Sequence, residues 1–221
     1  MQNLSKTKIK EIFTSIQGEG LEVGKKHIFV RFCKCNLKCN FCDTDFINGE
    51  ECSTFNLYEN LKDNDCDTIS FTGGEPLLDY QFLFEFLKEY KQKLNKKIYL
   101  ETNGTLAKEL EKIIDFVDII AMDIKLESAT AQENKFEINK KFIEIAKNKN
   151  LFIKIVFDEK INDFEIKNSI KLVKNDNIPI ILQPKMPLDE NLNLEEVYNK
   201  FYKEYKNVYL IPQTHKFLNL A

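Results

Sequence analysis

Residues 28–44 read IFVRFCKCNLKCNFCDT, and this stretch decides how the rest of the sequence is interpreted. Its first five residues are apolar apart from Arg31, which is typical of a strand that is buried on both faces. Cys35, Cys39 and Cys42 follow with the spacing C-x3-C-x2-C. A loop with these gaps can place three thiolates around one face of an iron–sulfur cube, although protein clusters normally take four cysteines. Three ligands leave one iron open, and an open metal position can bind a substrate or cofactor.

The remaining cysteines leave an alternative open. A structural zinc site would need a fourth ligand, which Cys33 could supply. We favour the iron–sulfur cluster and interpret Cys33 as a small core residue at the end of a strand. Cys52 and Cys66 have no partner spacing and are predicted to be structural. A disulfide framework is not expected, because the chain is neither small nor of secretory type.

Further along the chain, short apolar runs alternate with longer amphipathic segments. The predicted strands cover residues 28–32, 68–72, 97–101, 118–123, 151–157, 178–183 and 208–212. The predicted helices cover residues 56–62, 80–94, 106–114, 136–149, 163–174 and 194–205. This alternation is typical of parallel βα units. A complete eight-fold barrel usually takes about 250 residues, so we expect an α/β fold with an incomplete (β/α)6 barrel of parallel strands.

Composition limits the possible functions. The 221 residues include 32 Lys and Arg against 35 Asp and Glu, which gives a formal net charge of −3. A general nucleic-acid binder is usually basic, so direct binding of nucleic acid is not expected. The sequence has no apolar run of the ~20 residues that a membrane helix needs, and no secretory signal at its start. A cytoplasmic protein of one domain, residues 1–221, is therefore expected.

Polar or glycine-bearing segments follow the predicted strands, where the chemistry of such folds is usually located. They include Gly73-Gly74-Glu75-Pro76, Asp123-Ile124-Lys125 and Gln183-Pro184. Paired glycines allow the backbone to approach a ligand closely. Together with the cysteine loop, these segments resemble the radical S-adenosylmethionine (SAM) superfamily. This resemblance implies that the open iron binds the methionine group of SAM.

Motifs nearer the two ends of the chain extend the resemblance. Residues 13–20 read FTSIQGEG, residues 42–44 CDT, residues 181–184 ILQP and residues 212–218 PQTHKFL. Together they resemble the 7-carboxy-7-deazaguanine synthase family of queuosine biosynthesis, from about Glu11 to the C-terminus. The resemblance implies a substrate-binding N-terminal extension, residues 1–26, followed by a partial barrel of the radical SAM type, residues 27–221.

The resemblance also implies roles for particular residues. Substrate would be bound by Ile16, Gln17, Gly18, Glu19, Arg31, Thr72, His215 and the terminal carboxylate of Ala221. SAM would be bound by Phe41, Cys42, Asp43, Gly74, Glu75, Asp123, Ile124, Lys125, Gln183 and Pro184. A [4Fe-4S] cluster would be bound by Cys35, Cys39 and Cys42, and Mg2+ by the hydroxyl of Thr44, since Mg2+ prefers oxygen ligands. SAM supplies the radical, so no separate catalytic residue is expected. His27 belongs to no motif and is predicted to lie at the surface.

The implied activity is a ring contraction. A radical derived from SAM removes hydrogen from 6-carboxy-5,6,7,8-tetrahydropterin, which becomes 7-carboxy-7-deazaguanine with loss of ammonia. The implied partners are the small-molecule substrate, an electron donor such as flavodoxin or ferredoxin, and a second copy of the chain in a homodimer. An alternative is a radical SAM activating enzyme for a glycyl-radical partner protein. That enzyme would share the cluster but would not need residues 17–19, Arg31 or Thr44. A non-enzymatic alternative is a zinc-stabilised binding module.

Overall fold

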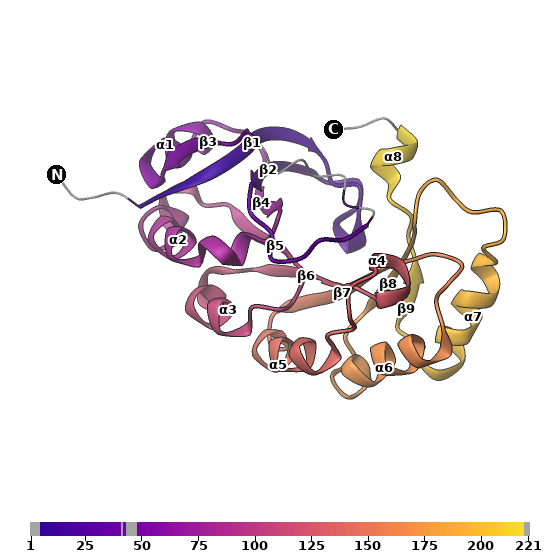
Figure 1. The fold of residues 1–221 in the computed structure, drawn as a ribbon. Helices are drawn as coiled ribbons and strands as arrows, with labels where there is room; N and C mark the ends of the chain where they lie inside the picture. Colours follow the sequence, from indigo (N-terminus) through magenta and orange to yellow (C-terminus); the bar gives the residue numbers. More distant parts are fainter. Residues whose placement is uncertain (1–4, 41, 43–47, 219–221) are drawn as a thin grey trace.

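The computed structural model describes residues 5–40, 42 and 48–218, and a curved sheet forms its centre (Figure 1). Over these residues the sheet has nine strands in the order β3-β1-β2-β4-β5-β6-β7-β8-β9. Neighbouring strands from β2 to β9 are parallel. They are β2 (Lys26–Phe32), β4 (Thr68–Gly73), β5 (Lys97–Thr102), β6 (Ile119–Ile124), β7 (Asn150–Phe157), β8 (Ile180–Pro184) and β9 (Val208–Leu210). These are the seven predicted strands, and the sheet does not close, so the incomplete barrel is confirmed.

Two antiparallel strands extend the sheet beyond β2, and the sequence analysis did not predict them. Strand β1 (Lys6–Ile16) pairs with β2, and β3 (Glu50–Ser53) pairs with β1. Exposed and buried positions alternate in the first half of β1, as expected for a strand with one wet face. The division at residue 26 stays a prediction, but much of the expected extension is a strand of the main sheet.

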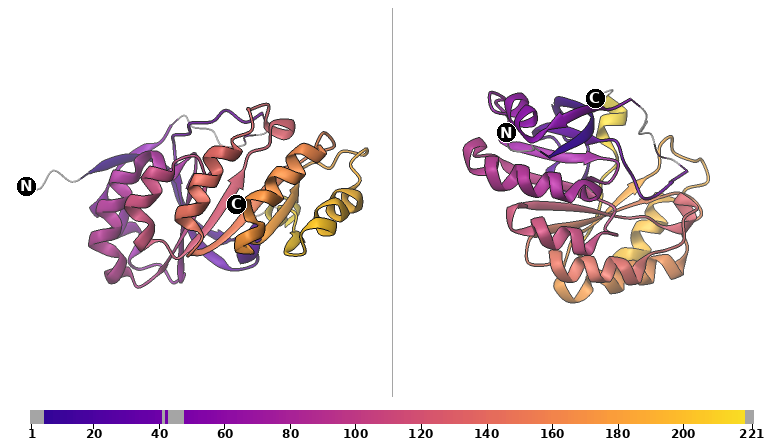
Figure 2. Two further views of the ribbon diagram at one scale, coloured as in Figure 1. Left: turned by 90° about the horizontal axis from the view of Figure 1, so that it is seen from below. Right: turned by 60° about the vertical axis from the view of Figure 1, so that its left-hand side comes forward.

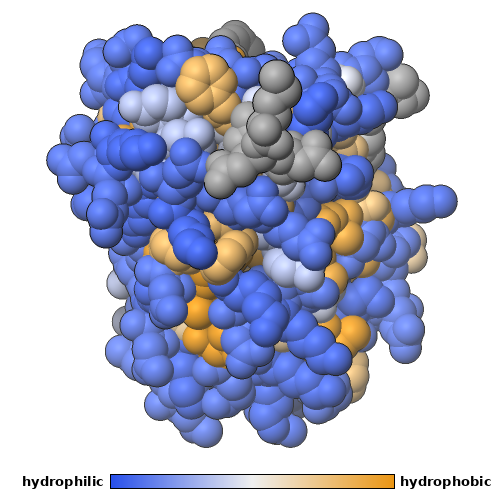
Figure 3. All heavy atoms as spheres, turned by 90° about the vertical axis from the view of Figure 1, so that its left-hand side faces the viewer, coloured by the Kyte–Doolittle hydropathy of each residue, from blue (hydrophilic) through white to orange (hydrophobic). Residues whose placement is uncertain are grey.

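The six predicted helices lie side by side on the convex face of the sheet (Figures 1 and 2). They are α1 (Thr54–Leu61), α2 (Tyr80–Leu94), α3 (Ala107–Ile113), α5 (Phe136–Ala146), α6 (Asp163–Val173) and α7 (Leu194–Glu204). Short helices occur at η1 (Gly20–Glu22), η2 (Pro76–Asp79), η3 (Ile114–Phe116), α4 (Glu127–Thr130), η4 (Lys174–Asp176) and α8 (Thr214–Leu218). The outer surface over α1 and α2 is mostly hydrophilic (Figure 3). No helix of the described residues has the length and apolar character to cross a bilayer.

Most of the hydrophobic core lies between the sheet and these helices. Phe71 of β4 contacts Phe86 of α2 edge to face, with ring centroids 6.1 Å apart, and both side chains are buried. A smaller cluster on the concave face contains Tyr99, Phe152 and Ile181. The parallel strands from β2 to β8 therefore bury side chains on both faces, which explains their nearly continuous apolar sequences, whereas the edge strand β9 exposes Tyr209 and Leu210.

His27 lies beside the concave cluster, so its predicted surface position is wrong. The side chain is fully buried, and its ring meets the ring of Tyr99 edge-on at 5.4 Å. Its Nδ1 lies 2.7 Å from Oγ of Ser70. Burial lowers the pKa of His27 to about 4, so the imidazole is neutral at physiological pH. The sequence carries no signal for this position, because one histidine does not define a periodic pattern.

The N-terminal segment also packs across the concave face of the sheet. Helix η1 contacts β7, and Gly20 of η1 has φ +67°. A Cβ atom at Gly20 would lie 2.4 Å from the ring of Phe152. A glycine is thus required here both by the backbone conformation and by the close approach of the two segments.

Gly20→Ala should lower the free energy of unfolding more than Gly24→Ala does. Gly24 also has a positive φ of +87°, but among the described residues no atom lies within 4 Å of the place that a Cβ atom would take there. The Gly24 change should cost about 1–2 kcal/mol through backbone strain. The Gly20 change should cost roughly 1–3 kcal/mol more, because the methyl group overlaps Phe152. Urea denaturation measures both values, and equal losses would contradict the packing of η1 on β7.

Candidate active site

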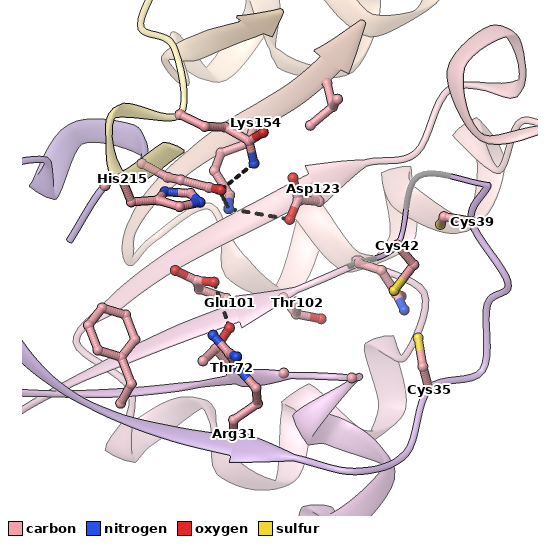
Figure 4. A pocket seen from close by; sticks show the side chains of 18 of the residues that line it. Arg31, Cys35, Cys39, Cys42, Thr72, Glu101, Thr102, Asp123, Lys154 and His215 are labelled. Atoms are coloured by element: carbon pink, nitrogen blue, oxygen red, sulfur yellow. Dashed lines mark hydrogen bonds and ion pairs between the residues drawn. The ribbon is translucent and has the colours of Figure 1, made fainter. Parts of the chain in front are cut away.

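Five polar side chains from five neighbouring strands point into one pocket on the concave face (Figure 4). Toward the amino ends of the same strands, apolar side chains cover the concave face. In β7, for example, the apolar Phe152 lies two positions before Lys154. Side chains two residues apart lie on the same face of a strand, so the concave face changes from apolar to polar toward the carboxyl ends. The five side chains are Arg31 (β2), Thr72 (β4), Glu101 (β5), Asp123 (β6) and Lys154 (β7).

The three cysteines of the C-x3-C-x2-C motif line one end of this pocket. In Figure 4, the sulfurs of Cys35 and Cys42 face each other, and Cys39 lies on the same loop. Over residues 5–40, 42 and 48–218, no three cysteine, histidine or acidic side chains converge tightly enough to bind a single ion. Three thiols that line one end of a cavity suit an iron–sulfur cluster, which cysteine thiolates bind.

Cys33 does not belong to this set. Its side chain is buried, and its Sγ would lie 2.0 Å from a Cβ atom added at Gly49, away from the pocket lining. The predicted core position of Cys33 is therefore confirmed, and Cys52 and Cys66 are buried, in agreement with the structural role predicted for them. The fourth ligand of the zinc alternative is not supplied by Cys33 in this arrangement.

Hydrogen bonds fix the cysteine loop to the rest of the barrel. The Asn36 amide donates to Oγ1 of Thr105 at 2.8 Å, and the amide of Asn103 donates to Oδ1 of Asn36 at 2.8 Å. The backbone N–H of Asn40 donates to the carbonyl of Thr130 at 3.3 Å. The loop is thus held from the exit of β5 and from the end of α4, on both sides of Cys39.

The exit of β4 lies directly against the cysteine loop. The backbone N–H of Glu75 donates to the carbonyl of Lys34 at 2.6 Å. A Cβ atom at Gly74 would lie 1.8 Å from that carbonyl oxygen, so a side chain does not fit there. Gly74 itself lines the pocket beside the cysteines. The glycine pair therefore brings backbone to the edge of the pocket, as the motif predicts.

Glu75 turns away from the pocket. Its fully buried carboxylate accepts hydrogen bonds from Oγ1 of Thr102 at 2.8 Å and from the backbone N–H groups of Asn103 and Leu77 at 2.7 and 3.2 Å. Burial raises its pKa to about 7, although these hydrogen bonds oppose the shift. Glu75 therefore connects the carboxyl ends of β4 and β5. It supports the lining residues Thr102 and Asn103 without lining the pocket itself.

The opposite side of the pocket is formed by residues 17–19. The amide of Gln17 donates to Oε1 of Glu101 at 2.9 Å, and the hydroxyl of Thr72 donates to Oε2 of Glu101 at 2.7 Å. Gly18 lies against the imidazole of His215, which would be 2.4 Å from a Cβ atom added at Gly18. The carbonyl of Gly18 also accepts from the backbone N–H of Thr214 at 2.9 Å. Segments nearly 200 residues apart in the sequence thus meet at the pocket.

Glu19 carries a negative charge that is largely shielded from solvent and has defined partners. Its Oε2 lies 2.6 Å from Nζ of Lys154, and its Oε1 accepts from the amide of Gln213 at 2.6 Å. Nζ of Lys154 also lies 3.4 Å from Asp123, which in turn lies 3.5 Å from Lys125. Burial would raise the pKa of Glu19, but the charge and hydrogen bonds of Lys154 and Gln213 outweigh it and lower the pKa to about 2.

Arg31 lies at the rim and is partly exposed. Its guanidinium is 2.6 Å from Oε1 of Glu11 and stacks over the ring of Phe13 at 5.1 Å. Phe13 in turn stacks on Phe29 of β2. The aromatic pair supports the planar guanidinium, which can bind a carboxylate through two parallel hydrogen bonds.

Most of the predicted site residues thus come together in one pocket. Those that line it are Ile16, Gln17, Gly18, Glu19, Arg31, Cys35, Cys39, Cys42, Thr72, Gly74, Asp123, Lys125 and His215. The side chain of Ile124 belongs to the core between sheet and helices, while Glu75, Gln183 and Pro184 are buried beside the pocket lining. Four predicted residues, Phe41, Asp43, Thr44 and Ala221, lie outside the described residues.

Gln183 is notable because its amide is buried without a hydrogen-bond partner in the described part of the chain. It lies on the concave side of β8, two positions after Ile181 of the inner cluster. Buried amides normally have partners. An orphaned amide at the carboxyl end of a strand therefore fits a site that a polar cofactor completes.

Several lining residues were not assigned to the site from the sequence. Lys154 had a readable signal, because a lysine inside the apolar run LFIKIVF (residues 151–157) must find a charged partner. Glu101 ends the third predicted strand and follows the same logic. Several others lie in motifs or in segments that follow predicted strands, although no role was given to them individually: Phe13, Gly73, Thr102, Asn103, Gln213 and Lys216. Phe29, Leu37 and Val156 have no such signal, because their positions depend on tertiary packing.

Glu75 should make the stability of the protein fall as pH rises from about 4.5 to 7. Its pKa is 4.5 ordinarily and about 7 in the folded protein, so folding takes up a proton in this range and is favoured below it. The stability advantage of wild type over Glu75→Gln should therefore be largest near pH 4.5 and shrink toward pH 7. Urea denaturation at a series of pH values measures this difference. A constant difference across the range would contradict the raised pKa of Glu75.

Comparisons with known proteins agree with this site. A family model described as a 4Fe-4S single cluster domain matches residues 16–148. The crystal structure of QueE from Escherichia coli superposes with a TM-score of 0.68 over 95% of each chain, at 19% identity, which shows a shared fold.

Curated relatives extend the similarity over nearly the whole chain. The 7-carboxy-7-deazaguanine synthase of Geobacter sulfurreducens is 34% identical, with 95% of this chain and 96% of that protein covered. The enzyme of the same name from Methanothermobacter thermautotrophicus is 32% identical, with 98% and 99% covered. Identity at this level over this length, together with the cysteine-lined pocket, shows that the chain belongs to the 7-carboxy-7-deazaguanine synthase family.

Proposed function

We propose that the protein is a radical SAM lyase that converts 6-carboxy-5,6,7,8-tetrahydropterin to 7-carboxy-7-deazaguanine with loss of ammonia, a step of queuosine biosynthesis. The observation that carries the proposal is one pocket that joins three cysteines at one end to charged and amide side chains at the other. A cluster-bound cofactor and a small polar substrate would meet in the middle of that pocket. The names of the relatives support this product.

The cofactors would be held by residues whose positions suit them. Cys35, Cys39 and Cys42 would bind a [4Fe-4S] cluster, and SAM would lie between the cluster, Gly74 and Asp123. When bound, the cluster and SAM supply the one-electron chemistry that removes a hydrogen atom from the substrate. Lys125 faces Cys39, and its positive charge favours the thiolate form against the effect of burial.

The protein itself would bind and orient the substrate and exclude water. The Glu101 carboxylate accepts hydrogen bonds from Gln17 and Thr72, so it fixes both side chains at the edge of the space for the pterin ring. Glu19 presents a fixed negative charge to the N–H groups of the ring. Arg31 is the donor suited to the substrate carboxylate, and it is already oriented by Phe13 and Glu11.

Further parts of the proposal follow the resemblance. Thr44 would bind Mg2+, which would orient the substrate carboxylate and stabilise charge during the rearrangement. His215 and the carboxylate of Ala221 would close over the substrate. A flavodoxin or ferredoxin would supply the electron. We place the enzyme in the cytoplasm as a homodimer.

The deciding experiment is turnover without a partner protein. Protein reconstituted with iron and sulfide under anaerobic conditions is incubated with SAM, a reductant and 6-carboxy-5,6,7,8-tetrahydropterin, and products are identified by mass spectrometry. Formation of 7-carboxy-7-deazaguanine is expected. Cleavage of SAM without this product would overturn the proposal and favour an activating enzyme for a glycyl-radical partner.

Cys39→Ser should abolish incorporation of the cluster, whereas Cys33→Ser should leave it intact. Cys39 lines the pocket, and Cys33 packs against Gly49 although it lies only two residues from Cys35. Iron and sulfide analysis after anaerobic reconstitution measures the difference, and circular dichroism confirms that both variants are folded. Equal iron content in the two variants would contradict the ligand assignment.

Arg31→Ala should weaken substrate binding without removing SAM cleavage. Loss of charge-assisted hydrogen bonds of about 1.5–3 kcal/mol corresponds to a rise in KM of roughly 10- to 150-fold. Lys26→Ala is a matched control, because Lys26 is on the same strand but pairs with Asp65 outside the pocket. Steady-state kinetics with separate measurement of 5′-deoxyadenosine provides both values. A variant that loses SAM cleavage as well would show that Arg31 serves the cofactor.

A further inference from the structure

We propose that Lys154 is a positioning residue that keeps Glu19 ionised and fixed in the pocket, and thereby couples the substrate-binding segment 17–19 to the cofactor-binding end of β6. The identity of the two ligands rests on the proposed function. The charge arrangement itself rests on the geometry of the described residues. No motif of the sequence analysis included Lys154.

The position of Lys154 needs an explanation beyond packing. Its side chain is only 2% exposed and lies between Phe152 and Val156 on the concave side of β7. An apolar residue would fill such a position without loss of solvation free energy, whereas a buried ammonium group is costly unless it is paired. The two carboxylates within 3.4 Å supply that pairing.

The contacts of Lys154 connect three separate parts of the chain. Its Nζ contacts Oε2 of Glu19 at 2.6 Å and Oδ2 of Asp123 at 3.4 Å. The other oxygen of Glu19 is held by Gln213 at 2.6 Å, so both carboxylate oxygens are fixed from opposite sides. The backbone N–H of Glu19 donates to Oε1 of Gln17, which itself is held by Glu101. Lys154 therefore connects Glu19 to β6, while Gln17 is held separately by Glu101 of β5.

The charges around this pair explain its protonation. The groups that face Glu19 and Lys154 are Tyr99 and Glu101 on β5, Asp123 and Lys125 on β6, Gln213 just before α8 and His215 in α8. Burial would lower the pKa of Lys154, but the nearby carboxylates raise it well above its usual value. Lys154 therefore keeps its proton and acts through its charge. Without that charge, burial would dominate and raise the pKa of Glu19.

The first test uses the protein without ligands. In wild type the pKa of Glu19 is lowered from 4.5 to about 2. Ionisation of Glu19 therefore contributes its full stabilisation above pH 4.5, and this contribution is lost as pH falls toward 2. In Lys154→Met the buried carboxyl should bind a proton on folding, so the variant should lose stability as pH rises above about 4.5. The difference in unfolding free energy from wild type should therefore grow between pH 5 and pH 8.

Lys91→Met is the matched control. Lys91 also forms an ion pair, with Asp118 at 2.9 Å, but outside the pocket, and water reaches both side chains. Its stability difference from wild type should stay constant between pH 5 and pH 8. If the differences for Lys154→Met and Lys91→Met have the same pH dependence, the proposed role of Lys154 is overturned.

A double variant tests the proposal even if Lys154→Met does not fold. Removing one member of a buried ion pair leaves an uncompensated charge, while removing both members costs much less. The double variant Glu19→Gln, Lys154→Met should therefore be more stable than Lys154→Met and should lose its extra pH dependence. A double variant that is no more stable than the single variant would overturn the proposal.

The third test measures binding of 6-carboxy-5,6,7,8-tetrahydropterin by calorimetry under anaerobic conditions. In Lys154→Met the Kd for the pterin should rise at least about tenfold at pH 6, because the ordered carboxylate of Glu19 is lost. In the pH range where Glu19 titrates, this Kd should change by up to about tenfold per pH unit. Wild type and Lys91→Met should share one pH profile. Binding by Lys154→Met with the wild-type Kd and profile would overturn the role of Lys154. If wild type itself does not bind the pterin, the proposed function fails, and the two ligand-free tests still decide the role of Lys154.

Discussion

Parallel strands that are buried on both faces leave one main place for polar side chains, the carboxyl end of the concave face. Over the described residues, helices α1, α2, α3, α5, α6 and α7 cover the convex face, and Tyr99, Phe152 and their neighbours fill the concave face toward the amino ends of the strands. Arg31, Glu101 and Lys154 take the remaining positions above this apolar layer. The site is therefore a consequence of how the sheet is packed, since the same alternation that builds the core orients the functional groups.

Charge balance is the second requirement of this arrangement. Glu19, Glu101 and Asp123 bring three carboxylates into a partly enclosed space, and four cationic side chains line the same pocket, namely Arg31, Lys125, Lys154 and Lys216. Each carboxylate has at least one donor or cation within hydrogen-bonding or ion-pair distance. Such a network orders the pocket before a ligand enters, which lowers the entropic cost of binding.

The sequence predicts those parts of the structure in which a local residue pattern reflects burial or ligand spacing. The seven parallel strands were recognisable because both of their faces are apolar, and the cysteine loop was recognisable from its spacing. Strand β1 was missed because its wet face carries lysine and glutamate, which breaks the apolar run. The burial of His27 and the contact of Gln213 with Glu19 depend on segments that are distant in sequence, and no local pattern encodes them. The pocket position of Lys154 is predictable from the sequence, since a lysine inside an apolar strand needs a charged partner.

The close contact between Gly18 and the imidazole of His215 has an implication for protein engineering. Any side chain at position 18 occupies space that the histidine ring now fills, so the two positions cannot be varied independently. A library intended to alter ligand preference should therefore randomise them jointly and pair a larger residue at one position with a smaller one at the other. Screens that scan single substitutions would discard such combinations before they could be recovered.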